Sequence, residues 1–70
     1  MATYTFHMRT LHGGPLGLAI GEFANDGATF HEAGQMLDEH ISCDHVEVWS
    51  GDRAVLTRHR DQPIIRSVET

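Results

Sequence analysis

The chain has 70 residues, of which 40% are hydrophobic and 21% charged, a composition typical of one folded domain rather than a disordered tail or a coiled coil. It contains no lysine, which excludes Schiff-base catalysis and lysine-dependent phosphate loops, and its formal net charge of −5 argues against nucleic acid as a partner. With one cysteine, no signal-peptide features, and no apolar run near the roughly 20 residues that span a bilayer, we expect a cytoplasmic protein without a membrane partner.

The first part of the chain predicts a β-hairpin over residues 3–23. Residues 3–10 alternate between two faces, and residues 12–15 form a glycine- and proline-containing turn signal. The apolar residues of the first strand are Tyr4, Phe6 and Met8. In the second strand, one face carries Leu16, Leu18 and Ile20, and the other carries Gly17, Ala19 and Gly21. The small face allows another element to approach closely, although these glycines would also fit a long loop.

One amphipathic helix is expected from about residue 29 to residue 41. Thr29 and Glu32 fit a capping box, and Asp26 is a rival cap that would start the helix earlier. The residues of the apolar face are Phe30, Ala33, Gly34, Leu37 and Ile41, while Met36 lies on a flank. A glycine inside a helix costs about 1 kcal/mol relative to alanine, so Gly34 on this face indicates a closely packed strand.

A second hairpin is predicted over residues 45–59. Residues 45–50 alternate, with Val46 and Val48 inward and Trp49 on the other face. Gly51 and Asp52 form a glycine-first pair, which is typical of a type II′ turn. The return strand places Val55 and Thr57 on one face and Ala54, Leu56 and Arg58 on the other. Pro63 ends this run, and we expect residues 60–70 to form a tail that is flexible or bound by a partner.

Together these elements predict a single α+β domain over residues 1–70, with a small antiparallel sheet in the order ββαββ. The one helix packs on one face of the sheet and leaves the other uncovered. Trp49 falls on that other face, so we expect a homodimer that buries it.

The charges are segregated along the chain. Residues 22–47 hold seven acids and no arginine, whereas residues 53–66 hold four arginines and one acid. This pattern fits two solvated faces of one domain, and it also fits a dipolar surface that pairs with another chain. On the second interpretation the partner-binding residues are Trp49, Arg53, Arg58 and Arg60.

The densest group of possible metal ligands is His40, Cys43 and His45, at the junction between the helix and the third strand. Zinc takes thiolate and imidazole ligands, so these residues are a candidate zinc site. The alternative is a surface loop with two solvated histidines and a small thiol. The same residues would allow a thiol nucleophile, Cys43 activated by either histidine, in a minimal enzyme built across a dimer interface.

Three segments are similar in order to a group of small uncharacterised alphaproteobacterial proteins. These segments are Tyr4-x-Phe6-His7, the alanine- and leucine-bearing helix, and the hairpin at residues 46–53. The resemblance covers residues 4–58 and departs at the turn, which reads Gly-Asp instead of Asp-Gly-Arg, and at the glycine-rich insertion 13–21. It implies a small α+β fold and no particular activity.

The sequence therefore favours a small interaction module without catalytic activity that acts as a homo-oligomer and has no cofactor. A metal-binding or metal-sensing protein that uses His40, Cys43 and His45 is the alternative.

Overall fold

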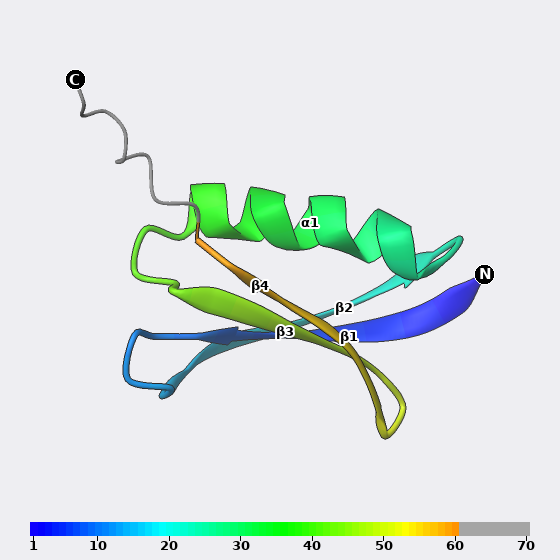
Figure 1. Cartoon of the computed structure of the whole chain (residues 1–70), viewed down its shortest axis with the longest axis horizontal. Helices are drawn as coiled ribbons and strands as arrows, with labels where there is room; N and C mark the ends of the chain where they lie inside the picture. Colours follow the sequence, from blue (N-terminus) through cyan, green and yellow to red (C-terminus); the bar gives the residue numbers. More distant parts are fainter. Residues whose placement is uncertain (61–70) are drawn as a thin grey trace.

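The computed structural model describes residues 1–60, which form four strands and one helix in the predicted order ββαββ (Figure 1). The elements are β1 (Ala2–Arg9), β2 (Pro15–Phe23), α1 (Asp26–Glu39), β3 (His45–Ser50) and β4 (Arg53–His59). All pairings are antiparallel, and the strand order β2-β1-β3-β4 puts β2 and β4 at the edges. The predicted α+β fold with one helix on one face of the sheet is confirmed.

The core lies between α1 and the face of the sheet beneath it. Its buried side chains are Tyr4, Phe6, Ala33, Met36, Leu37, Cys43, Val46 and Val48. The alternation predicted for β1 and β3 is confirmed, because Phe6, Val46 and Val48 are each at most 1% exposed. Burial of this apolar surface is the main source of stability in a domain of this size.

The small face of β2 is turned toward the helix and is filled by neighbouring side chains. A Cβ on Gly17 would lie 2.7 Å from the Met8 terminal methyl, and one on Gly21 would lie 2.9 Å from the Phe23 ring. Phe23 in turn meets Phe6 edge to face, with ring centroids 5.5 Å apart. The glycines of β2 therefore make room for side chains of the core, and the long-loop alternative is wrong.

The helix begins earlier than the capping-box pattern predicted. The Asn25 side chain accepts a hydrogen bond from the Ala28 amide and is the N-cap, in the manner favoured for asparagine. Thr29 is fully buried one turn later, and its hydroxyl donates to the Asp26 carbonyl. The start at residue 29 is therefore wrong, and the expected alternative that the helix begins near Asp26 is closer.

The buried stripe of α1 also differs from the predicted apolar face. It consists of Thr29, Ala33, Met36 and Leu37. Met36 was expected on a flank but lies in the core, while Phe30 is 47% exposed at the rim. Ile41 is 90% exposed because the helix ends at Glu39, before reaching it.

The second hairpin has the predicted turn but also a bulge that changes which side chains share a face. Gly51 has φ +63° while Asp52 does not have a positive φ, as a type II′ turn requires. The β3–β4 register shifts after Val48, which pairs with Leu56, so that Trp49 pairs with Ala54. Val55 is the extra residue, and the bulge places Ala54 on the opposite face from Leu56, contrary to the simple alternation.

In the part of the chain that the structure describes, no helix is long and apolar enough to cross a membrane. The expected tail, apart from Arg60, and the strand end at Pro63 lie outside the described residues.

Candidate functional site

The sheet face opposite α1 is not covered by any element within residues 1–60 (Figure 1). We call it the open face. Its central residues are Thr5, His7, Leu18, Ile20, Glu47 and Trp49. Leu18 is 60% exposed and Ile20 69%, so two large aliphatic side chains project from edge strand β2 into solvent.

Trp49 lies in the same row of the sheet as Ile20. Both residues pair with Thr5, one from each neighbouring strand, so their backbones are about 10 Å apart. The Trp49 ring is half-buried and sits on the side opposite Val48, as the sequence predicted. Leu18, Ile20 and Trp49, with Thr5 of β1 between the last two, are the large apolar side chains of this face, and we call them the open-face patch.

Leu16 does not belong to this patch, although the simple alternation placed it with Leu18 and Ile20. The β1–β2 register shifts between Met8 and Arg9, and Leu16 is the extra residue of that bulge. It lines a small groove with Met8 and Ile41, near the C-terminal end of α1.

Arg53 is tied to the beginning of the helix. Its guanidinium forms a two-point contact with the Asp26 carboxylate, at 3.2 and 3.3 Å, and the Tyr4 hydroxyl donates to the same carboxylate at 2.7 Å. Hydrogen bonds from Arg53 and from Tyr4 lower the pKa of Asp26 below its ordinary value. Hydrogen bonding to Asp26, together with partial desolvation, raises the pKa of Tyr4.

We expect the Asp26 contacts to make stability depend on acid pH. A carboxyl group whose pKa is lowered by folding stabilises the fold above its unfolded-state pKa, and this contribution is lost as pH falls through the folded-state pKa. Wild type should therefore be more stable than Asp26→Asn by a constant amount at neutral pH, and the difference should shrink below about pH 4. Urea unfolding at several pH values measures this, and a difference independent of pH down to pH 2.5 would contradict it.

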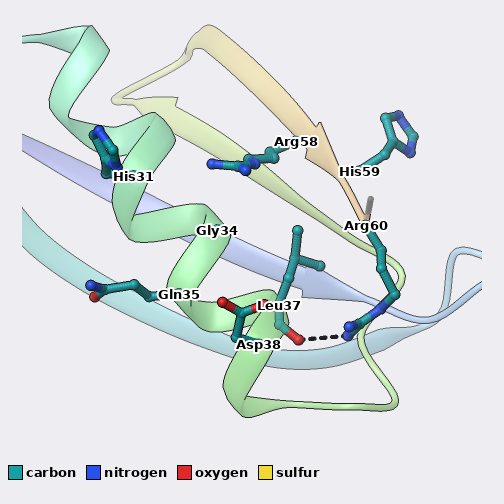
Figure 2. Close-up of a pocket in the computed structure, with 8 residues that line it drawn as sticks. All are labelled: His31, Gly34, Gln35, Leu37, Asp38, Arg58, His59 and Arg60. Carbon is teal, nitrogen blue, oxygen red and sulfur yellow. Dashed lines mark hydrogen bonds between the residues drawn. The ribbon is translucent and has the colours of Figure 1, made fainter. Parts of the chain in front are cut away.

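Arg58 lies in a groove between α1 and β4, beside the helical glycine (Figure 2). Its Nη1 donates to the Phe30 carbonyl at 2.9 Å, and its guanidinium carbon is 4.0 Å from the centre of the Phe30 ring. A Cβ on Gly34 would lie 2.5 Å from the same Nη1. The close approach predicted at Gly34 is therefore made by an arginine side chain of β4.

A double-mutant cycle should show this dependence between Gly34 and Arg58. In the wild-type chain, Gly34→Ala displaces the exposed end of the Arg58 side chain, and this displacement offsets the helix propensity gained, about 1 kcal/mol. In an Arg58→Ala chain, the same change should stabilise the protein by about 1 kcal/mol. Equal effects of Gly34→Ala in the two backgrounds, measured by urea unfolding, would rule out the coupling.

Arg60 closes the other end of the helix. Its Nη2 donates to the carbonyls of Leu37, His40 and Cys43 at 2.6, 2.8 and 2.7 Å, and its Nε donates to Cys43 at 3.0 Å. These carbonyls belong to the last turn of α1 and the connection after it, where backbone acceptors have no helical partner.

The four residues expected to bind a partner are thus separated in the structure. Arg53 and Arg58 lie on β4 and Arg60 follows its end. These three arginines contact the beginning, middle and end of α1, whereas Trp49 lies on the open face. One arginine of the basic segment and one carboxylate of the acidic segment pair within the chain, at Arg53 and Asp26. Of the four, Trp49 is the one on the same face as the exposed Leu18 and Ile20.

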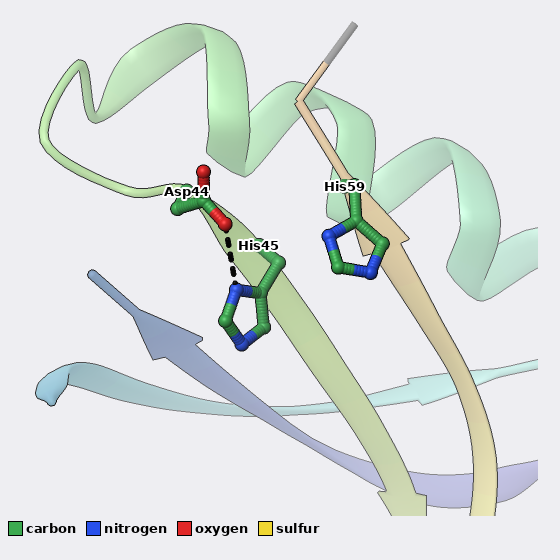
Figure 3. Close-up of side chains that lie close together, drawn as sticks. All are labelled: Asp44, His45 and His59. Atoms are coloured by element: carbon green, nitrogen blue, oxygen red, sulfur yellow. Dashed lines mark hydrogen bonds and ion pairs between the residues drawn. The ribbon is translucent and has the colours of Figure 1, made fainter. Parts of the chain in front are cut away.

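The expected metal ligands are also separated. Cys43 is 1% exposed, packs in the core and donates from its thiol to the His45 carbonyl at 3.3 Å. His40 is exposed at the C-cap of the helix. Among the described residues, His45 is instead grouped with Asp44 and His59, whose ligand atoms all lie within 4.8 Å of one another (Figure 3).

Local sequence patterns did not predict this grouping, because the grouping depends on strand register. His45 and His59 are 14 positions apart but directly opposite in the β3–β4 ladder, with ring centroids 5.2 Å apart. The signal was present in the hairpin turn, since pairing outward from Gly51 and Asp52 brings the two strand ends together. The bulge at Val55 sets which residue opposes His45.

Comparison with family models, with curated proteins and with solved structures gives no match for this chain.

Proposed function

We propose that this chain is a small non-catalytic interaction module that acts as a homodimer, with the open face as its interface. The observation that carries the proposal is the open-face patch, in which Leu18 and Ile20 are 60% and 69% exposed beside Trp49. Apolar side chains grouped on a face that no other element covers are typical of an interaction surface.

The occupant that fits this face best is a second copy of the same chain. Side chains on a sheet face point perpendicular to the sheet, so pairing at the β2 edge alone would leave Leu18 and Ile20 exposed. Packing of one open face on another buries them together with Trp49. The core then has the familiar form of two sheets packed face to face, each covered by a helix on its outer side.

The size of the open face is compatible with a weak to moderate dimer. Four strands about 4.8 Å apart and about eight residues long give a flat face of roughly 500 Å². The accessible surface area is larger, because side chains project from this face. Specific interfaces bury about 600–1,000 Å² per partner, so the whole face is needed. We therefore expect a dimer that dissociates on dilution through the micromolar range.

One orientation of the two copies matches apolar with apolar surface. A two-fold axis that crosses the strands stacks β2 on β2 of the partner subunit, whereas an axis parallel to the strands stacks β2 on β4. On this face β2 presents Leu18 and Ile20, while β4 presents Thr57 and His59. The first orientation is the one that we propose.

Trp49 is the only tryptophan of the chain, so its fluorescence reports on the interface directly. On dilution from about 300 to about 1 µM, we expect its emission to shift to longer wavelength and its quenching by acrylamide to increase, as the ring becomes hydrated. Far-UV circular dichroism over the same range should stay constant, because the monomer keeps its fold. Emission and quenching that do not change with concentration would contradict the proposal.

A further inference from the structure

We propose that Asp44, His45 and His59 form a binding site for a divalent transition metal ion, with Zn²⁺ as the representative ion. The site lies at the corner of the sheet where β3 begins and β4 ends (Figure 3). It shares no residue with the open-face patch, although His45, Glu47 and His59 lie on the same face of the sheet. It does not use the ligands suggested by the sequence at His40 and Cys43.

The three ligand atoms are already close to a coordination geometry. They all lie within 4.8 Å of one another, and the Asp44 Oδ2 is 2.9 Å from the His45 Nδ1. Zinc bonds of 2.0–2.1 Å in a tetrahedron place ligand atoms about 3.3–3.4 Å apart. The longest separation must therefore shrink by at most about 1.5 Å on binding, and the 2.9 Å separation must lengthen slightly.

His59 can supply this movement. It is exposed on edge strand β4, so its ring can rotate without displacing core side chains. Its position opposite His45 is fixed by the ladder, and the two ring planes are tilted by 37° with centroids 5.2 Å apart.

The backbone under the site is held on both sides. The Asp44 amide donates to the Arg9 carbonyl at 2.8 Å, and the Asp44 carbonyl accepts from the Arg60 amide at 2.9 Å. A ligand set built on such a fixed backbone is ordered before the ion arrives, and this ordering reduces the entropy lost on binding.

The orientation of His45 assigns its two nitrogens different roles. Nδ1 faces Asp44 and is therefore the metal ligand, while Nε2 lies 4.0 Å from the Glu47 Oε2. A carboxylate beside the other nitrogen of a ligating histidine fixes the ring and raises its basicity. Glu47 takes this role if its Oε2 moves from 4.0 Å to hydrogen-bond distance of Nε2; its Oε1 is already 3.4 Å from the Nε of Arg9.

The donor set selects the class of ion. Two imidazoles and one carboxylate suit zinc and its transition-metal neighbours, whereas calcium and magnesium require mainly oxygen ligands. Asp44 and Glu47 supply two negative charges, which Arg9 and the Arg60 guanidinium at the Cys43 carbonyl balance, so the selection rests on the donor types. Three protein ligands leave a coordination position for water or another group.

The test is titration of the metal-free chain, carrying no affinity tag, with Zn²⁺ by calorimetry and by thermal melting. At a hundredfold excess of Zn²⁺ over the dissociation constant, we expect the melting temperature to rise by about 10 °C or more. His59→Gln removes a ligand and should weaken Zn²⁺ binding by a factor of about ten or more. Substitution of a residue that only hydrogen-bonds to a metal ligand already costs about 10–100-fold in affinity. Glu47→Gln should give a smaller loss.

His40→Gln is the matched control, because it makes the same change at an exposed histidine outside the site. It should leave the affinity unchanged, and bound Co²⁺ should show no thiolate charge-transfer absorption. Ile20→Asp should bind Zn²⁺ at least as tightly as wild type, because the proposed dimer covers the face on which His45, Glu47 and His59 lie. The proposal is overturned if wild type does not bind, if His40→Gln weakens binding as much as His59→Gln, or if Cys43 proves to be a ligand.

Discussion

Ile20→Asp should shift the equilibrium strongly toward a folded monomer. In the proposed dimer, the two-fold symmetric interface buries Ile20 of both copies. One substitution therefore places two carboxylates in an apolar interface. Burying unpaired charge costs several kcal/mol, and we expect the dissociation constant to rise at least about 100-fold. Size-exclusion chromatography with light scattering at about 300 µM measures this.

Ile41→Asp provides a matched control for this substitution. Ile41 is even more exposed than Ile20, at 90% against 69%, but it follows α1 and lies away from the open face. The same change of side chain there should leave the mass of the wild-type dimer unaltered. If both variants dissociate equally, or if neither does, the open face is not the interface.

Arg60→Ala should cause a large loss of stability without changing the interface. It removes the donor that serves three backbone carbonyls, including that of the buried Cys43. Hydrogen bonds to charged groups contribute about 1.5–3 kcal/mol each, but their effects at one side chain overlap, so we expect a total loss of about 2–4 kcal/mol. In a domain of this size the melting temperature should fall by about 10–20 °C.

Two comparisons separate this effect from the simple loss of charge. Arg60→Lys keeps the charge but has no planar fork to reach several carbonyls, so it should recover only a minor part of the loss. Arg53→Ala, which breaks an exposed ion pair, should lower the melting temperature much less. All melts need the same protein concentration, because dimerisation itself adds stability. A fall of less than about 2 °C for Arg60→Ala would show that α1 ends without its help.

The order and type of the elements could be predicted from the sequence because local patterns determine them. Alternation identified β1 and β3, and Gly51 marked the second turn. Because the chain is short and has one amphipathic segment, the expected arrangement was a single sheet with one helix on one face. The position of Trp49 on the uncovered face followed directly from its alternation with Val48.

The details that failed depend on tertiary packing or on bulges. Thr29 matched a capping pattern, but burial against the sheet places it inside the helix, and Asn25 is the cap. Extra residues at Leu16 and Val55 changed which side chains share a face, and no local signal marked either of them.

The candidate sites show the same limit. The arginines looked like a partner surface because sequence alone does not show that carbonyls of α1 lie within their reach. Cys43 looked like a ligand because it lies between two histidines, but its side chain turns into the core. Proximity along the chain was a poor guide to proximity in space, whereas strand register brought His45 and His59 together.

Sedimentation equilibrium of the wild-type chain, from about 1 to about 300 µM, tests the proposed dimer most directly. A core that leaves Leu18, Ile20 and Trp49 on an open face predicts a reversible equilibrium between the chain mass and twice that mass, with the dimer dominant at the highest concentration. A single species of the chain mass throughout this range would contradict it.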